Sequence, residues 1–130
     1  MEAPRIYPTF RFTDAEAMHR WFTETLGFKT LMRHPDSGPI QHAELAFGSA
    51  IIMIGQQRDD EFSSISPAPG GSVTYIAVDD PDRLFAQVEA AGTEIVQPPV
   101  DMDYPSREFV ARAPDGNLWC FGTWWPKAPA

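Results

Sequence analysis

The chain has 130 residues, a length typical of one domain with a substantial buried core. Acidic residues outnumber basic ones by 18 to 10, and the resulting net charge of −8 argues against nucleic-acid binding, which requires positive charge. The single cysteine, Cys120, excludes an intrachain disulfide and a cysteine-based zinc site.

Two further properties of the sequence bear on its location and partners. No apolar run is long enough to span a membrane, and the first residues lack the basic and hydrophobic segments of a signal peptide. We therefore expect a cytoplasmic protein with no membrane partner. The negative charge favours a soluble surface, and it also attracts cationic small molecules.

The first half of the sequence predicts a strand, a helix and three further strands. Residues 7–12 form an apolar strand, after which Thr13 and Glu16 make a capping-box signature and Asp14 favours the start of a helix. Apolar residues then recur at helical intervals until Gly27, a residue type that is common at helix C-termini. Three strands are predicted at residues 29–33, 40–47 and 49–55.

The second half repeats this pattern after a polar segment rich in serine and proline. We predict that this segment, residues 56–70, is a mobile linker. A strand at 72–78 precedes Asp80, the predicted helix cap, and Pro81, which is favoured at the first helical position. The helix ends near Gly92, and three strands are predicted at residues 94–100, 107–113 and 118–124.

The order of elements is therefore β-α-β-β-β, twice. This pattern predicts an α+β fold in which two tandem βαβββ modules form a half-open, curved, mixed β-sheet around one shared cavity. The modules are expected at about residues 5–55 and 71–126, joined by the linker 56–70 within a single domain of residues 1–130.

This layout resembles the vicinal oxygen chelate superfamily, which includes glyoxalase I, extradiol dioxygenases, fosfomycin-resistance proteins and bleomycin-resistance proteins. The resemblance rests on Leu-Gly-Phe at residues 26–28 and Ala-Pro-Asp-Gly-Asn-Leu-Trp at residues 113–119. The closing string Trp-Cys-Phe-Gly-Thr-Trp at residues 119–124 is most similar to small, metal-free bacterial members described as bleomycin-resistance-like.

The resemblance also implies where a metal site would lie. Enzymes of the superfamily hold a divalent ion with His or Gln, Glu, His and Glu. Carried over by spacing, these positions fall on Tyr7, Met53, Val73 and Cys120. A divalent ion prefers imidazole and carboxylate at such positions, so we predict no metal and no other cofactor here. A divalent metal is expected only under the alternative function given below.

Strand alternation extends these four positions to a predicted cavity lining. The predicted ligand-binding residues are Tyr7, Thr9, Arg11, His42, Glu44, Met53, Val73, Tyr75, Arg107, Phe109 and Cys120. Arg107 and Phe109 follow from one of two registers that the seventh strand allows. The predicted lining is mainly apolar and aromatic with a few polar groups, which suits an organic molecule of medium size.

Several of these residues also have a purely structural explanation. His42 and Glu44 share one strand face, where they act either as a general base or metal ligands, or only as a solvated strand surface. Arg11 either clamps a ligand carboxylate or pairs with Glu44 across the sheet. Cys120 has no histidine or lysine near it in sequence, so we expect an unreactive, buried thiol.

The leading hypothesis is a metal-free, non-catalytic protein that binds a small organic ligand, cationic or antibiotic, in the concave cavity. The alternative is an enzyme, and Glu44 and His42 are then the candidate catalytic residues. This enzyme is either a metal-dependent lyase or dioxygenase of the vicinal oxygen chelate type, or a metal-independent isomerase. The resemblance also implies a homodimer.

Overall fold

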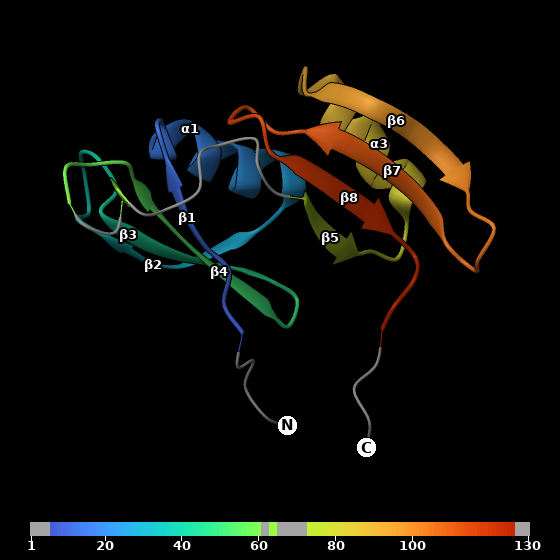
Figure 1. The fold of residues 1–130 in the computed structure, drawn as a ribbon, viewed down its shortest axis with the longest axis horizontal. Helices are drawn as coiled ribbons and strands as arrows, with labels where there is room; N and C mark the ends of the chain where they lie inside the picture. Colours follow the sequence, from blue (N-terminus) through green and yellow to red (C-terminus); the bar gives the residue numbers. More distant parts are fainter. Residues whose placement is uncertain (1–5, 61–62, 65–72, 127–130) are drawn as a thin grey trace. The chain divides into compact units, whose positions relative to one another are not determined.

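A computed structural model describes residues 6–60, 63–64 and 73–126 of the chain. The chain divides into two compact units, Met1–Pro69 and Gly70–Ala130, and each contains one four-stranded mixed sheet with helix on one face (Figure 1). Neither sheet is closed, and the two tandem βαβββ modules confirm the predicted fold class. No helix in the described ranges has the length and apolar character needed to cross a bilayer.

The first unit has the strand order β1-β4-β3-β2. Strands β1 and β4 run parallel, and the other neighbours run antiparallel. The elements are β1 (Thr9–Phe12), α1 (Ala15–Arg20), η1 (Trp21–Leu26), β2 (Lys29–His34), β3 (His42–Phe47) and β4 (Ala50–Gln56).

The helix of the first unit begins and ends close to the predicted residues but is not regular throughout. Asp14 rather than Thr13 is the N-cap, and its Oδ1 accepts a hydrogen bond from the Ala17 N–H at 3.0 Å. The α-helix α1 then continues as the π-helix η1. Gly27 ends this helix with a φ of 89°. Glycine adopts this left-handed conformation without strain because it has no Cβ.

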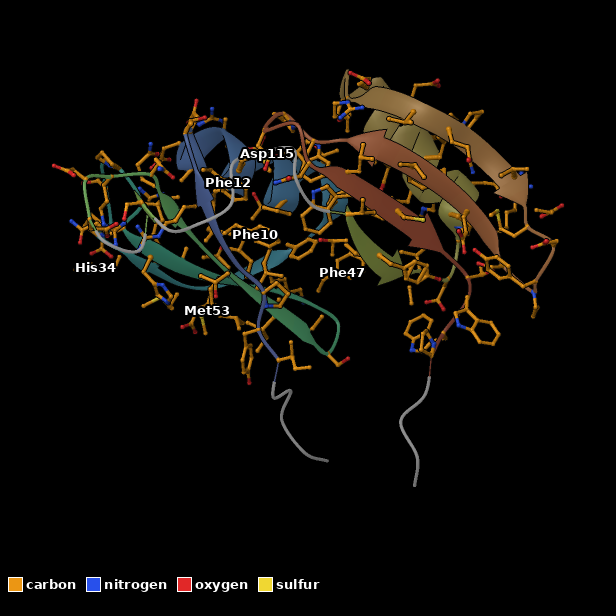
Figure 2. All side chains as sticks on the ribbon, in the orientation of Figure 1. Phe10, Phe12, His34, Phe47, Met53 and Asp115 are labelled. Atoms are coloured by element: carbon orange, nitrogen blue, oxygen red, sulfur yellow. The ribbon has the colours of Figure 1, made fainter. Side chains whose placement is uncertain are left out.

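Aromatic side chains between this helix and its sheet form the core of the first unit. The rings of Phe12 and Phe22 lie 6.2 Å apart, and Phe22 lies 5.1 Å from Phe28. Phe12 points to the side of β1 that the helix covers, whereas Met53 of β4 lies on the other side (Figure 2). We call the side of each sheet turned away from its helix the open face. Strand alternation then fixes which residues this face carries.

The second unit repeats the topology with the strand order β5-β8-β7-β6. Asp80 caps its helix as predicted, since its Oδ1 accepts a hydrogen bond from the Arg83 N–H at 3.1 Å, and Pro81 occupies the first turn. The elements are β5 (Val73–Ala77), α3 (Pro81–Ala90), β6 (Glu94–Asp101), β7 (Arg107–Arg112) and β8 (Leu118–Gly122).

Residues 61–62 and 65–70 of the predicted linker 56–70 lie outside the described residues. In the described part, Gln56 still belongs to β4, and the Gln57 N–H donates a hydrogen bond to the Phe12 carbonyl at 2.7 Å. The start of this segment is therefore held against the end of β1. The mobility predicted for the segment stays a prediction.

Candidate functional site

The open face of the first sheet carries polar residues on β1 and β3 and sulfur on β4. Ala43 and Leu45 of β3 are fully buried on the helix side, which leaves the alternate residues on the open face. Tyr7, which precedes β1, is half-buried. The predicted ligand-binding residues on this face are Thr9, Arg11, His42, Glu44 and Met53.

Arg11 is held by acidic and hydroxyl partners from the segment that follows β4. Its Nη1 donates to Asp60 Oδ2 at 3.1 Å and to Ser63 Oγ at 2.9 Å, and only 12% of its side chain is exposed. The structural alternative open to Arg11 in the sequence was a pair with Glu44, and the acid that it contacts here is Asp60. The guanidinium is thus neutralised from within the unit, and its structural explanation is the stronger one.

His42 and Glu44 form the second polar group on this face. The His42 Nε2 lies 3.0 Å from Glu44 Oε2, and both side chains are partly exposed. Glu44 is paired in register with Met53 of β4. An imidazole in contact with a carboxylate is able to accept a proton, so the geometry is compatible with a general base.

The open face of the second sheet is hollowed into a pocket of about 690 Å³. We call it the second-sheet pocket. It is lined by Val73, Tyr75, Tyr104, Pro105, Glu108, Cys120 and Trp124. Three of these residues, Val73, Tyr75 and Cys120, were predicted to bind ligand, and the structure brings them together. Tyr75 and Cys120 lie side by side in register on the parallel strands β5 and β8.

Glu108 of β7 is the charged residue of this pocket and was not among the predicted site residues. Only 6% of its surface is exposed. The Tyr104 hydroxyl donates a hydrogen bond to its Oε2 at 2.9 Å, and the Cys120 thiol lies 3.6 Å from its Oε1. Both partners are uncharged donors. In the described part of the chain, the ion pairs of arginine and histidine are formed with acids other than Glu108.

The structure corrects the predicted register of β7. Phe109 is fully buried, because its ring stacks on Phe121 at 4.7 Å and packs edge-on against Phe85 of α3. Arg107 lies on the same side and binds Asp82 at the start of α3. The prediction that these two residues line the cavity is therefore wrong, since they face the helix.

A signal in the sequence was available to find Glu108. The Asp-Gly turn at residues 115–116 joins β7 and β8, and the Ala113 N–H donates a hydrogen bond to the Asn117 carbonyl at 2.9 Å across it. Counting outward from this pair places Glu108 opposite Gly122, which shares the open face with Cys120.

Gly122 allows the polar groups of the pocket to approach one another closely. A Cβ at this position would lie 2.6 Å from the Glu108 Cγ, 2.9 Å from the Tyr75 hydroxyl oxygen and 3.0 Å from the Ser106 Oγ. The Tyr75 hydroxyl donates a hydrogen bond to the Trp124 carbonyl, and the Trp124 N–H donates one to Ser106 Oγ at 3.0 Å. These bonds fix the Trp124 backbone at the edge of the pocket.

The neutral donors around Glu108 keep their protons at neutral pH. Burial raises the pKa of Cys120 to about 11, and the negative charge of Glu108 adds to the increase. The hydrogen bond to Glu108 raises the pKa of Tyr104, and burial raises the pKa of Tyr75. The pocket therefore presents one carboxylate surrounded by hydroxyl groups and a protonated thiol.

The four positions implied for a metal do not suit a divalent ion. Val73 has no donor atom, Met53 offers a thioether, and the Cys120 thiol retains its proton because its pKa is about 11. Within residues 6–60, 63–64 and 73–126, no three His, Cys, Asp or Glu side chains are grouped so that they could hold a metal ion.

Comparisons with known proteins agree with this description of the fold. The family model of the Glyoxalase/Bleomycin resistance protein/Dioxygenase superfamily matches residues 7–121. TioX from Micromonospora sp. ML1 is 28% identical, with a TM-score of 0.78, over 97% of this chain and 100% of that chain. The virulence protein STM3117 from Salmonella typhimurium is 25% identical, with a TM-score of 0.71, over 94% of this chain and 98% of that chain. A superfamily member from Sphaerobacter thermophilus DSM 20745 shares the fold at 20% identity, with a TM-score of 0.74, over 94% and 98% of the two chains. No curated protein matches the sequence.

Proposed function

Because this chain belongs to the Glyoxalase/Bleomycin resistance protein/Dioxygenase superfamily, we propose that it binds a small organic molecule in the second-sheet pocket without a metal ion. The observation that carries this proposal is the pocket itself, whose walls are mainly apolar and aromatic. Its volume of about 690 Å³ lies within the range of small-molecule sites, roughly 300–1,000 Å³. The net charge of −8 favours a cationic ligand, and the superfamily makes an antibiotic a reasonable ligand class.

Trp124 offers a direct test, because a second tryptophan follows it as a matched control. Both side chains are exposed to a similar extent, 47% for Trp124 and 53% for Trp125, but only Trp124 lines the pocket. Titration calorimetry with naphthylmethanol, a neutral aromatic probe, is expected to detect binding to the wild-type chain. Trp124→Ala removes one aromatic wall and is expected to weaken binding by about 1–2 kcal/mol, roughly five- to thirtyfold, whereas Trp125→Ala leaves it unchanged.

Two results would contradict this proposal. One is the absence of binding by the wild-type chain at millimolar concentration both of this probe and of its charged counterparts, naphthylmethylamine and naphthoate. The other is an equal loss of affinity in both tryptophan variants, which would place the probe outside the pocket. Metal analysis of protein purified without chelator supplies a third check, since stoichiometric Ni, Zn, Fe or Mn would contradict the metal-free part of the proposal.

The second candidate function is a metal-independent isomerase, favoured by the contact between His42 and Glu44. Their distance of 3.0 Å and their partial exposure support a general base that is accessible to a substrate. Glu44→Gln keeps the shape of the side chain but removes its basicity. Turnover of an α-ketohemithioacetal by the wild-type chain that is lost in Glu44→Gln would favour the isomerase over the binding protein.

A further inference from the structure

We propose that Glu108 makes the second-sheet pocket selective for organic cations, with its carboxylate binding a protonated amine or amidine carried on an aromatic body. This inference rests on the proposed function, because it names the class of ligand that the same pocket takes. It depends on four features of the structure: the burial of Glu108, the identity of its hydrogen-bond partners, the pairing of the nearby arginines with other acids, and the aromatic walls of the pocket.

The first feature is the depth at which the carboxylate lies. Glu108 is 94% buried and lines the pocket, with Gly122 of β8 opposite it on one side and Val100 of β6 on the other. A carboxylate in such surroundings is rarely left without strong partners, because removing a charge from water is costly. A positively charged ligand stabilises the buried carboxylate and so compensates for its lost hydration.

The second feature is that the partners of Glu108 leave room for a further donor. Each of its oxygens has one recorded neutral partner, the Tyr104 hydroxyl at 2.9 Å and the Cys120 thiol at 3.6 Å. A carboxylate has about four lone-pair sites, so it is able to accept additional hydrogen bonds. Hydrogen bonds between an ammonium or amidinium group and a carboxylate are roughly twice as strong as those between neutral groups.

The third feature is that the arginines of the same strand are committed to other acids. Arg107 precedes Glu108 in the chain but points to the helix side, where it binds Asp82 at 2.9 Å. Arg112, at the far end of β7, binds Glu94 at 3.1 Å. No ion pair to Glu108 is recorded among the described residues, so the positive charge is available from the ligand rather than from the chain.

The fourth feature is the aromatic character of the pocket walls. Tyr75, Tyr104 and Trp124 all line the pocket, and aromatic faces attract cations as well as flat apolar groups. An aromatic amine satisfies both parts of the site, since its ring packs on these walls while its nitrogen approaches Glu108. The net charge of −8 further favours the approach of a cation.

The experiment compares three probes of nearly equal shape and different charge by titration calorimetry at pH 7. They are naphthylmethylamine, which is cationic, naphthylmethanol, which is neutral, and naphthoate, which is anionic. The wild-type chain is expected to bind the amine at least about tenfold more tightly than the alcohol, as a charged hydrogen bond predicts, and naphthoate most weakly. Glu108→Gln is expected to reduce the ratio between amine and alcohol to near one, while the alcohol still binds.

Glu89→Gln is the matched control, because it removes the same charge from an exposed position on α3, away from the pocket. This variant is expected to keep the preference for the amine. Equal affinity of the wild-type chain for amine and alcohol would overturn the role of Glu108 and leave the proposed function standing. Failure of all three probes to bind would overturn the proposed function itself. A preference for the amine that persists in Glu108→Gln would show that another group selects the charge. The wild-type comparison needs no variant, so it holds even if Glu108→Gln fails to fold.

Discussion

Gly122→Ala tests whether the pocket is as tightly arranged as the structure describes. Gly122 does not have a positive φ, so alanine is compatible with its backbone and the effect of the substitution is steric. The new methyl group would lie 2.6 Å from the Glu108 Cγ and 2.9 Å from the Tyr75 hydroxyl oxygen, whereas ordinary carbon contacts are about 3.5–4.0 Å. The side chains must therefore move by nearly an ångström.

The expected cost of this crowding is about 1–3 kcal/mol in the free energy of unfolding, measured by urea denaturation. Because the displaced side chains belong to the second-sheet pocket, binding of naphthylmethylamine is also expected to weaken by at least about tenfold. The variant thus predicts a combined loss of stability and affinity.

Gly55 provides the matched control from the first unit. It lies two residues after Met53 as Gly122 lies two residues after Cys120, and it also lacks a positive φ. A Cβ at Gly55 would lie 2.6 Å from the Gln41 carbonyl oxygen, which is backbone and yields less easily than a side chain. Gly55→Ala is expected to lose at least as much stability and to keep its affinity for the probe. Wild-type stability and affinity in Gly122→Ala, or equal loss of affinity in both variants, would refute the reasoning.

Three further predictions concern Phe109 in the core of the second unit, the thiol of Cys120, and Asp60, the acid that pairs with Arg11. Phe109→Ala is expected to lower the free energy of unfolding in urea by about 3–5 kcal/mol, since Phe109 is fully buried; a loss below about 1 kcal/mol would place it on the open face after all. Cys120 is half-buried rather than buried as expected from the sequence, and its pKa of about 11 predicts slow reaction with iodoacetamide at pH 7.5 and faster reaction as the pH rises; rapid labelling at neutral pH would contradict this raised pKa. The Ser63 N–H, with help from Arg11, lowers the pKa of Asp60 to about 2, so its stabilisation is present above about pH 4 and is lost as the pH falls towards 2. In Asp60→Asn, the free energy of unfolding in urea should change less between pH 5 and 2 than in the wild-type chain. An equally steep loss in both chains would contradict the role of Asp60.

Local features of the sequence were sufficient to predict the fold. Asp14 and Asp80 mark the helix starts, and Gly27 marks the end of the first helix, because capping depends on residues within one turn. Alternation in β3 likewise separated His42 and Glu44 from the buried Ala43 and Leu45. The sequence did not reveal the change from α1 to η1, since a segment of six residues is too short for its apolar spacing to distinguish a π-helix from an α-helix.

The candidate site was harder to predict because its polar contacts come from loops and from strand register. Arg11 finds Asp60 and Ser63 beyond β4, in a segment whose composition indicated only a linker. Tyr104 reaches Glu108 from the loop between β6 and β7, and no periodic pattern specifies such a contact. The predicted homodimer and the shared cavity stay predictions.

In this duplicated architecture, the residues that stabilise the fold are different from those that are able to contact a ligand. Each unit completes its own hydrogen-bond ladder and its own aromatic core, and along every strand the residues that maintain the core alternate with those on the open face. Substitutions on one open face therefore leave the aromatic core on the other side of the sheet in place, although a close-packed position such as Gly122 is costly to change. Such an architecture allows a new ligand to be bound after a few open-face side chains of one unit are exchanged, while the core of that unit and the whole of the other unit stay unchanged.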